Sequence, residues 1–193
     1  MPPDVTGQPG FTELPVAAFL RAMAAPQPAP AGGCAAALAL AQAAALSAKT
    51  ARLSARQLPA DRTDQLAAEA EQIREAAASL IDEDARAYGA VIEARREPAE
   101  AGRVADALSR AADVPMRIVE LAAEAAELAA VLATDGNPAL RGDALTALLL
   151  AQAAAGSAAI LVRIDLAGLA GDARLDQAER LLGLIAQSAE RVR

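Results

Sequence analysis

The stretch that decides the fold is GGCAAALALAQAAALSA, residues 32–48. It carries no charged side chain, and apolar residues surround the helix it would form. A helix that is apolar on every side belongs at the centre of a helical protein. A second stretch, ALTALLLAQAAAGSAAILV at residues 144–162, has the same character. We predict two long central helices, over about 32–58 and 139–164, and a buried position rather than a membrane span for the second.

Amphipathic segments and turn signals place further helices around this pair. The predicted outer helices are a short one from Thr12 to about Ala24, a long one from Ala60 or Asp61 to Arg96, one from Pro98 to about Ala133 that kinks at Pro115, and a last one from after 168–172 to near Arg191. No strand pattern is present. The sequence therefore predicts an all-α fold: an antiparallel bundle of about five long helices plus a short N-terminal helix. Residues 11–193 form one domain, and residues 1–10 form a disordered tail.

Composition excludes several classes of function. The 193 residues contain no histidine and one cysteine, so a Ser-His-Asp triad, a His-ligated zinc and a Cys-His pair are excluded within one chain. A net charge of −7 leaves no basic footprint for nucleic acid. Cys34 cannot form an intrachain disulfide, and residues 1–10 lack the features of a signal peptide, so we expect a cytoplasmic protein. Acid–base chemistry would have to come from carboxylates, and we predict no metal site.

Two segments carry candidate functional groups: a glycine turn at the start of a helix and an acidic segment within another helix. Gly32 and Gly33 precede Cys34 at the start of the first central helix, where free N–H groups and the helix dipole favour an anion or a carbonyl oxygen. The plain alternative is that the glycines only make the turn possible. Asp82 and Asp84 lie near Tyr88; Asp84 and Tyr88 are four apart and share a helix face, whereas Asp82 points about 200° away from Asp84. Here the alternative is a solvated charged face.

Three further residues are candidates for binding contacts. Asn137 lies in a turn, and Asp143 opens an otherwise uncharged helix, where it could simply complement the helix dipole. Arg163 lies near the end of the same helix. It could pair with a ligand carboxylate or complement the negative end of the dipole.

Taken together, these segments resemble the formimidoyltetrahydrofolate cyclodeaminase / methenyltetrahydrofolate cyclohydrolase family. The resemblance covers about residues 11–192 and depends on the order and spacing of several short motifs. The matching segments are Pro28-Ala29-Pro30-Ala31-Gly32-Gly33-Cys34, Leu80-Ile81-Asp82-Glu83-Asp84-Ala85-Arg86-Ala87-Tyr88, Val114-Pro115, Gly136-Asn137, Gly142-Asp143 and Leu161-Val162-Arg163-Ile164-Asp165-Leu166.

The resemblance implies a dimeric helical bundle that binds a tetrahydrofolate derivative as its substrate, with no bound cofactor and no partner other than a second copy. The implied reaction is hydrolysis of 5,10-methenyltetrahydrofolate, or cyclisation of 5-formiminotetrahydrofolate with release of ammonia. It assigns acid–base catalysis to Asp84, with Asp82 as second choice. The implied binding residues are Gly32, Gly33, Cys34, Tyr88, Asn137, Asp143 and Arg163. The alternatives are another one-carbon or amidine substrate on the same bundle, and a non-catalytic binding or scaffold protein.

The sequence departs from the family pattern at several positions. Ala31 and Cys34 replace a glycine and a serine in the turn, and Gly142 replaces a serine before Asp143. Leu161 and Asp165 stand where the pattern has two asparagines. These replacements predict an altered substrate or a loss of activity.

Overall fold

The chain is described from a computed structural model, which covers residues 10–96, 101–169 and 171–192. Within these ranges it contains helices and no strand. The helical elements are η1 (Phe11–Glu13), α1 (Val16–Ala24), α2 (Gly32–Arg52), α3 (Ala60–Arg96), α4 (Ala101–Ala111), α5 (Asp113–Asp135), η2 (Pro138–Leu140), α6 (Arg141–Asp165) and α7 (Ala173–Glu190). The predicted all-α fold is confirmed.

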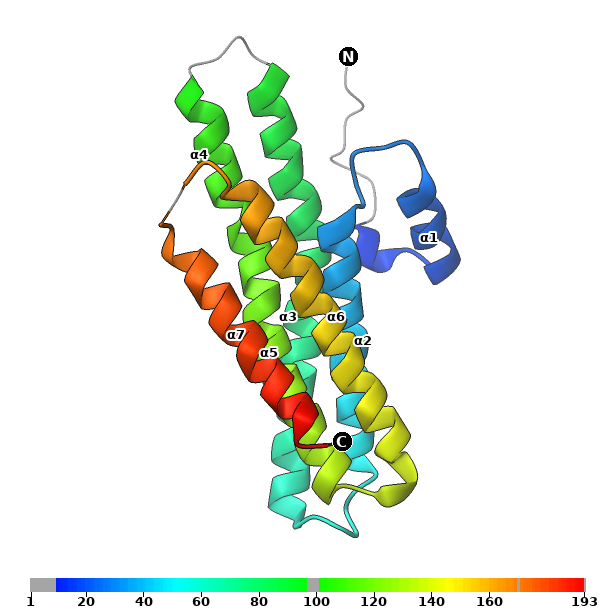
Figure 1. Cartoon of the computed structure of the whole chain (residues 1–193). Coiled ribbons are helices and arrows are strands. Elements are labelled where there is room, and N and C mark those ends of the chain that lie inside the picture. The colour runs from blue at the N-terminus through cyan, green and yellow to red at the C-terminus, as the bar shows by residue number, and fades with distance from the viewer. Residues whose placement is uncertain (1–9, 97–100, 170, 193) are drawn as a thin grey trace.

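The long helices form an up-and-down bundle (Figure 1). α2 packs against α3, α5 and α6, and α6 also packs against α5. α7 covers α5 and α6 from outside, and α1 lies beside the beginning of α2. The C-terminal end of α3 and the beginning of α4 extend side by side beyond the rest of the bundle. Between them, α3 and α4 enclose a small separate core that includes Val91 and Ala107.

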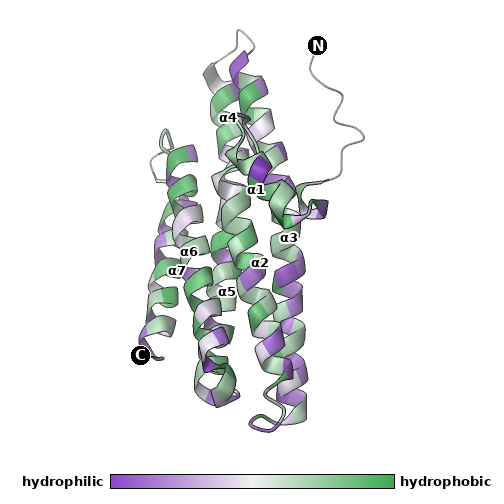
Figure 2. Ribbon diagram, turned by 90° about the vertical axis from the view of Figure 1, so that its right-hand side faces the viewer, coloured by the Kyte–Doolittle hydropathy of each residue, from purple (hydrophilic) through white to green (hydrophobic). Residues whose placement is uncertain are grey.

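Alanine provides most of the main core. Within the described part of the chain, Ala37, Ala43 and Ala51 of α2 are fully buried, as are many alanines of α5 and α6. Such small side chains let helix axes approach closely, and Figure 2 shows hydrophobic residues on the central helices and hydrophilic ones along α3. α2 and residues 138–165 are long and apolar enough to cross a membrane. Core helices share these properties, and both helices pack within the bundle here.

Three predicted helix boundaries were wrong. The first predicted helix is divided into η1 and α1, because Pro15 precedes α1 in an extended conformation. α2 ends at Arg52 rather than near residue 58, and turns follow it. The predicted helix over 98–133 is two helices that meet at Ala112. The first nine residues, where we predicted most of a disordered tail, lie outside the described ranges.

The interruption between α4 and α5 follows from Pro115. A proline has no N–H, so the Ala111 carbonyl cannot accept the usual helical hydrogen bond from position 115. Arg174, near the start of α7, forms hydrogen bonds with residues on both sides of this interruption. Its guanidinium donates to the Ser109 carbonyl at 2.7 Å and to Asp113 Oδ1 at 2.6 Å. The start of α7 is therefore tied to both sides of the break.

Candidate functional site

A cavity of about 460 Å³ opens at the beginning of α2. The connection before α2, the middle of α3, the α4–α5 break and the end of α6 all contribute to its wall. The lining residues are Gln27, Pro28, Ala31, Gly32, Gly33, Asp84, Ala87, Tyr88, Ala111, Pro115, Leu161, Ile164 and Asp165. Four of the predicted site residues, Gly32, Gly33, Asp84 and Tyr88, are thus brought together.

Asp84 lies against the first turn of α2. A side chain at Gly33 would overlap Asp84 Oδ1, so the absence of a Cβ at Gly33 makes room for this carboxylate. Cys34 Sγ lies 3.3 Å from Asp84 Oδ2 and 3.3 Å from the Ile81 carbonyl oxygen, and its single S–H is shared between them. The helix N-terminus predicted to bind a ligand anion is therefore occupied by the chain's own carboxylate, a favourable arrangement with the helix dipole.

Burial controls the protonation of this pair. Burial raises the pKa of Asp84 above its ordinary value, although hydrogen bonds from the Cys34 side chain and backbone act in the opposite direction. Burial also raises the pKa of the Cys34 thiol to about 12, with the nearby Asp84 charge adding to the effect. Cys34 therefore stays a neutral donor at physiological pH. A carboxyl group that is half-buried and has a raised pKa is well suited to exchange protons with a substrate.

Asp165 brings a second carboxylate to the same cavity. It is the last residue of α6, and burial raises its pKa, with the charge of Asp84 contributing and Arg95 opposing. Tyr88 is 41% exposed at the mouth of the cavity, and Leu161 and Ile164 provide apolar wall. The cavity thus combines two acids with flat apolar surfaces.

Asp82 points elsewhere. Its carboxylate accepts hydrogen bonds from the Phe11 backbone N–H at 2.7 Å and the Thr12 hydroxyl at 2.8 Å. Both oxygens are therefore engaged in holding η1 against α3. Asp82 does not line the cavity, and we retain Asp84 alone as the catalytic candidate.

Asn137 and Asp143 lie at the opposite end of α2. Asn137 caps η2 and donates from its side chain to the Leu53 carbonyl at 3.0 Å. Asp143 pairs with Lys49 at 2.7 Å. Lys49 is 16 residues after Gly33 along α2, a separation of about 24 Å at 1.5 Å per residue. The structure therefore places Asn137 and Asp143 away from the cavity within one chain.

Arg163 also lies outside the cavity lining. Its guanidinium donates to Glu179 of α7 at 2.6 Å, and it borders a different depression between α6 and α7. Neighbouring positions on α6 face the cavity instead, because successive helical residues point in directions about 100° apart.

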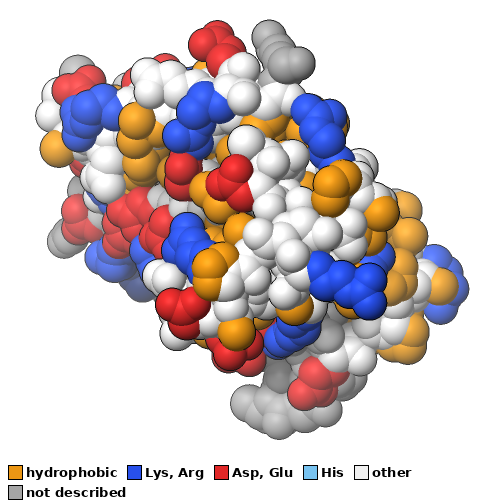
Figure 3. Space-filling view, turned by 90° about the horizontal axis from the view of Figure 1, so that it is seen from below, with side chains coloured by type: hydrophobic (Ala, Val, Ile, Leu, Met, Phe, Trp, Pro, Cys, Tyr) orange, Lys and Arg blue, Asp and Glu red, His pale blue; other side chains and the backbone are white. Residues whose placement is uncertain are grey.

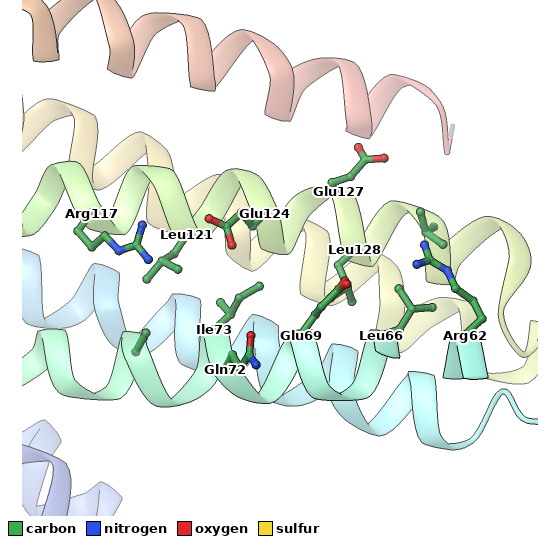
Figure 4. Close-up of a pocket in the computed structure, with 12 residues that line it drawn as sticks. Arg62, Leu66, Glu69, Gln72, Ile73, Arg117, Leu121, Glu124, Glu127 and Leu128 are labelled. Carbon is green, nitrogen blue, oxygen red and sulfur yellow. The ribbon is translucent and has the colours of Figure 1, made fainter. Parts of the chain in front are cut away.

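A second hollow, a groove with a volume of about 550 Å³, lies between α3 and α5 (Figure 4). Leu66, Ile73 and Leu128 contribute apolar surface to it. Two of its charged residues already have partners nearby: Arg117 pairs with Glu120 on its own helix, and Glu127 pairs with Arg191, which directly follows α7. The groove contains none of the residues predicted for the site.

Sequence reasoning missed the contributions of Gln27, Ala111, Pro115 and Ile164 and the position of Asp165 in the wall. Only Asp165 carried a signal. An acidic residue at the end of a helix faces the negative end of the dipole and is locally unfavourable. Such local conflicts are expected at functional sites.

The family model for formiminotransferase-cyclodeaminase matches residues 15–181. This match includes most of the chain and every element around the cavity. The chain belongs to this family. A solved structure of formiminotetrahydrofolate cyclodeaminase from Thermotoga maritima is similar in fold, with a TM-score of 0.83 over 93% of this chain and 94% of that one, at 24% identity. Among curated proteins, none matches this chain significantly.

Most departures from the family pattern gather in one place. Ala31, Leu161 and Asp165 line the cavity, and Cys34 contacts Asp84. Gly142 lies at the other end of α6. The replacements in the cavity wall are two apolar residues, Ala31 and Leu161, and one acid, Asp165, so they change its charge as well as its shape.

Proposed function

We propose that this chain is a folate one-carbon enzyme that hydrolyses 5,10-methenyltetrahydrofolate to 10-formyltetrahydrofolate, or cyclises 5-formiminotetrahydrofolate with release of ammonia. The observation that carries the proposal is Asp84, held half-buried between Gly33 and the cavity in a chain of this family. A cavity of about 460 Å³ is of the size that holds a small ligand.

Asp84 supplies the proton transfers that either reaction needs. In hydrolysis, water adds to the carbon of the N–C–N cation while the Asp84 carboxylate accepts a proton from it. The tetrahedral adduct then breaks its bond to N5, and N5 takes a proton from Asp84. The hydroxyl oxygen releases its proton to solvent as it becomes the carbonyl of the formyl group on N10. In cyclisation, N10 attacks the formimino carbon and loses its proton to Asp84, which passes it to the formimino nitrogen. With one further proton from solvent this nitrogen leaves as ammonia, and the N5–C–N10 cation remains. A nearby carboxylate also stabilises the delocalised cation.

A different one-carbon or amidine substrate is the second candidate, and a specific observation favours it. Leu161 and Asp165 give the cavity an apolar wall and a second acid where the family pattern has amides. Such a change alters which polar groups a substrate must present. The two candidates use the same acid and differ in the ligand that fills the cavity.

We propose a cytoplasmic homodimer that forms through α6. Leu149, Ile160 and Ile164 are 64%, 50% and 61% exposed, and they lie on one face of the helix. Exposed apolar stripes of this kind are typical of interaction surfaces. Ile164 also lines the cavity, so a second copy on this face would lie next to the site. Light scattering at micromolar concentration should give twice the mass of one chain, and a monomer would contradict the proposal.

The methenyl absorbance tests both reactions, because it decays during hydrolysis of 5,10-methenyltetrahydrofolate and grows during cyclisation of 5-formiminotetrahydrofolate. Purified protein should accelerate one of these changes, and Asp84→Asn should lower that rate constant by about 10²–10⁴-fold, the usual contribution of a general acid–base group. Asp64→Asn, an exposed residue about 30 Å from Asp84 along α3, is the matched control and should retain activity. If the wild-type protein does not exceed the uncatalysed rate with either folate, the proposed reaction is wrong.

A further inference from the structure

We propose that the cavity at the beginning of α2 selects planar cations that carry N–H donors, and that Asp165 is the residue that sets this selectivity. This inference rests on the proposed function and deepens it, because it uses the same cavity and the N–C–N cation of that reaction. What it adds is a specificity-determining residue, Asp165.

The charges of the lining residues point to a cation. The two charged side chains in the wall are both carboxylates, Asp84 from α3 and Asp165 from α6. None of the lining residues is lysine or arginine. Outside the lining, the positive charge of Arg95 lowers the pKa of Asp165, but within the described part of the chain the two side chains form no ion pair. An anionic group placed in this cavity would meet two acids and no basic partner.

Asp165 lies in a locally unfavourable position. As the last residue of α6 it faces the negative end of the helix dipole, and it makes no hydrogen bond or ion pair with another described residue. Asp84, in contrast, lies at the positive end of α2 and accepts a hydrogen bond from Cys34. A cation between the two acids would compensate Asp165 and leave the support of Asp84 in place.

The remaining wall suits a flat, donor-bearing ring. Tyr88 presents an aromatic surface that can attract a cation, and Leu161 and Ile164 offer apolar surface. Ala111 and Pro115, at the break between α4 and α5, complete this wall without adding a charged side chain. An amidinium has two N–H groups in one plane, which match the two oxygens of a carboxylate.

Benzamidinium and its neutral counterpart benzamide test the selectivity independently of folate chemistry, because they differ in charge and little in shape. Their dissociation constants are measured by ligand-observed NMR against the full-length wild type, Asp165→Asn and the control Asp64→Asn, an exposed residue about 30 Å from Asp84 along α3. We expect the wild type to prefer benzamidinium by tenfold or more. Asp165→Asn should reduce that preference by about tenfold, which corresponds to one modest ion-pair contribution, and Asp64→Asn should leave it unchanged.

Circular dichroism confirms that each variant is folded. Equal binding of the two probes, no binding of benzamidinium, or a preference that survives Asp165→Asn overturns the inference. Cation preference without turnover of either folate would reject the proposed reaction and leave the selectivity standing. Turnover without cation preference would do the reverse.

Discussion

The two ends of the α2–α6 pair use similar residues for different purposes. At the beginning of α2, Asp84 and Asp165 face a cavity, and one weak thiol donor is the side-chain partner of Asp84. At the other end, Asp143 pairs with Lys49, and Asn137 is bonded to neighbouring backbone. Figure 3 views that end and shows acidic and basic side chains interspersed. Acids that lack strong partners and face a hollow are available for chemistry, whereas paired acids hold helices together.

In this comparison, the largest expected effect on activity is a difference between alanine variants of two adjacent glycines, Gly32 and Gly33, at the cavity. A methyl group at Gly33 would overlap the Asp84 carboxylate, whereas at Gly32 the nearest atom, Leu161 Cδ2, is 4.0 Å away. Gly33→Ala should therefore displace Asp84 and reduce the rate of methenyl decay by about 10²-fold, the scale of a misplaced catalytic group. Gly32→Ala should stay within about threefold of wild type, since it leaves the carboxylate where it is.

Similar losses for the two alanine variants would mean that the glycines act through backbone flexibility rather than through space for Asp84. Thermal melts of both variants serve as the control. Alanine is the better helix former, so neither variant should lose stability through helix propensity.

The second effect is on stability, at the α4–α5 break that borders the cavity. Arg174→Ala removes hydrogen bonds to Ser109, Asp113 and Asp172 from a largely buried guanidinium. We expect the free energy of unfolding to fall by about 2 kcal/mol, in line with charge-assisted hydrogen bonds. Arg163→Ala breaks an exposed pair with Glu179 and should cost at most about 0.5 kcal/mol. Urea denaturation of both variants measures the difference, and equal losses would contradict the assigned role of Arg174.

Part of the fold, and part of the difference between the two ends of α2, could be predicted from the sequence. The long α3 was predicted with its boundaries nearly right, because Pro59 and a clear apolar periodicity delimit it. The angular argument that separates Asp82 from Asp84 agrees with their placement, since Asp84 lines the cavity and Asp82 does not. Pro115 indicated a disturbance in the helix but not a complete break at Ala112.

The rest depends on contacts between distant parts of the chain. Asp143 differs from Asp84 in its contacts because Lys49 lies opposite it, 94 residues earlier in the sequence. Likewise, Asp82 is engaged by Phe11, 71 residues away. Helical periodicity states which residues share a face, but it does not state which other helix that face meets. The pairing of polar groups therefore had to come from the packed structure.

A smaller effect should appear in the pH dependence of stability. Folding raises the pKa of Asp84 through burial, so the native state binds this proton more tightly than the unfolded chain. The stabilisation by the protonated form is complete below the unfolded pKa, which is about 3.9, and is lost as pH rises through the folded pKa. In Asp84→Asn this loss is absent. The stability of the variant relative to wild type should therefore increase with pH over that window, as measured by urea denaturation at a series of pH values. A constant difference would show that Asp84 is solvated as in the unfolded chain.

The smallest effect on stability and activity is expected at the Lys49–Asp143 salt bridge, at the end of α2 away from the cavity. Asp143→Asn breaks a salt bridge whose lysine side chain is 55% exposed, and such pairs contribute about 0–1 kcal/mol. Lys49→Met removes the same pair from the other side and should cost a similar amount. Both variants should keep the rate of methenyl decay within about twofold, because the pair lies far along α2 from the cavity. A large loss of activity without a loss of stability would contradict this division and would place the pair next to the site of a second copy in the dimer. Repeating the assay at several protein concentrations separates the two cases, since an effect through the dimer depends on how much dimer is present.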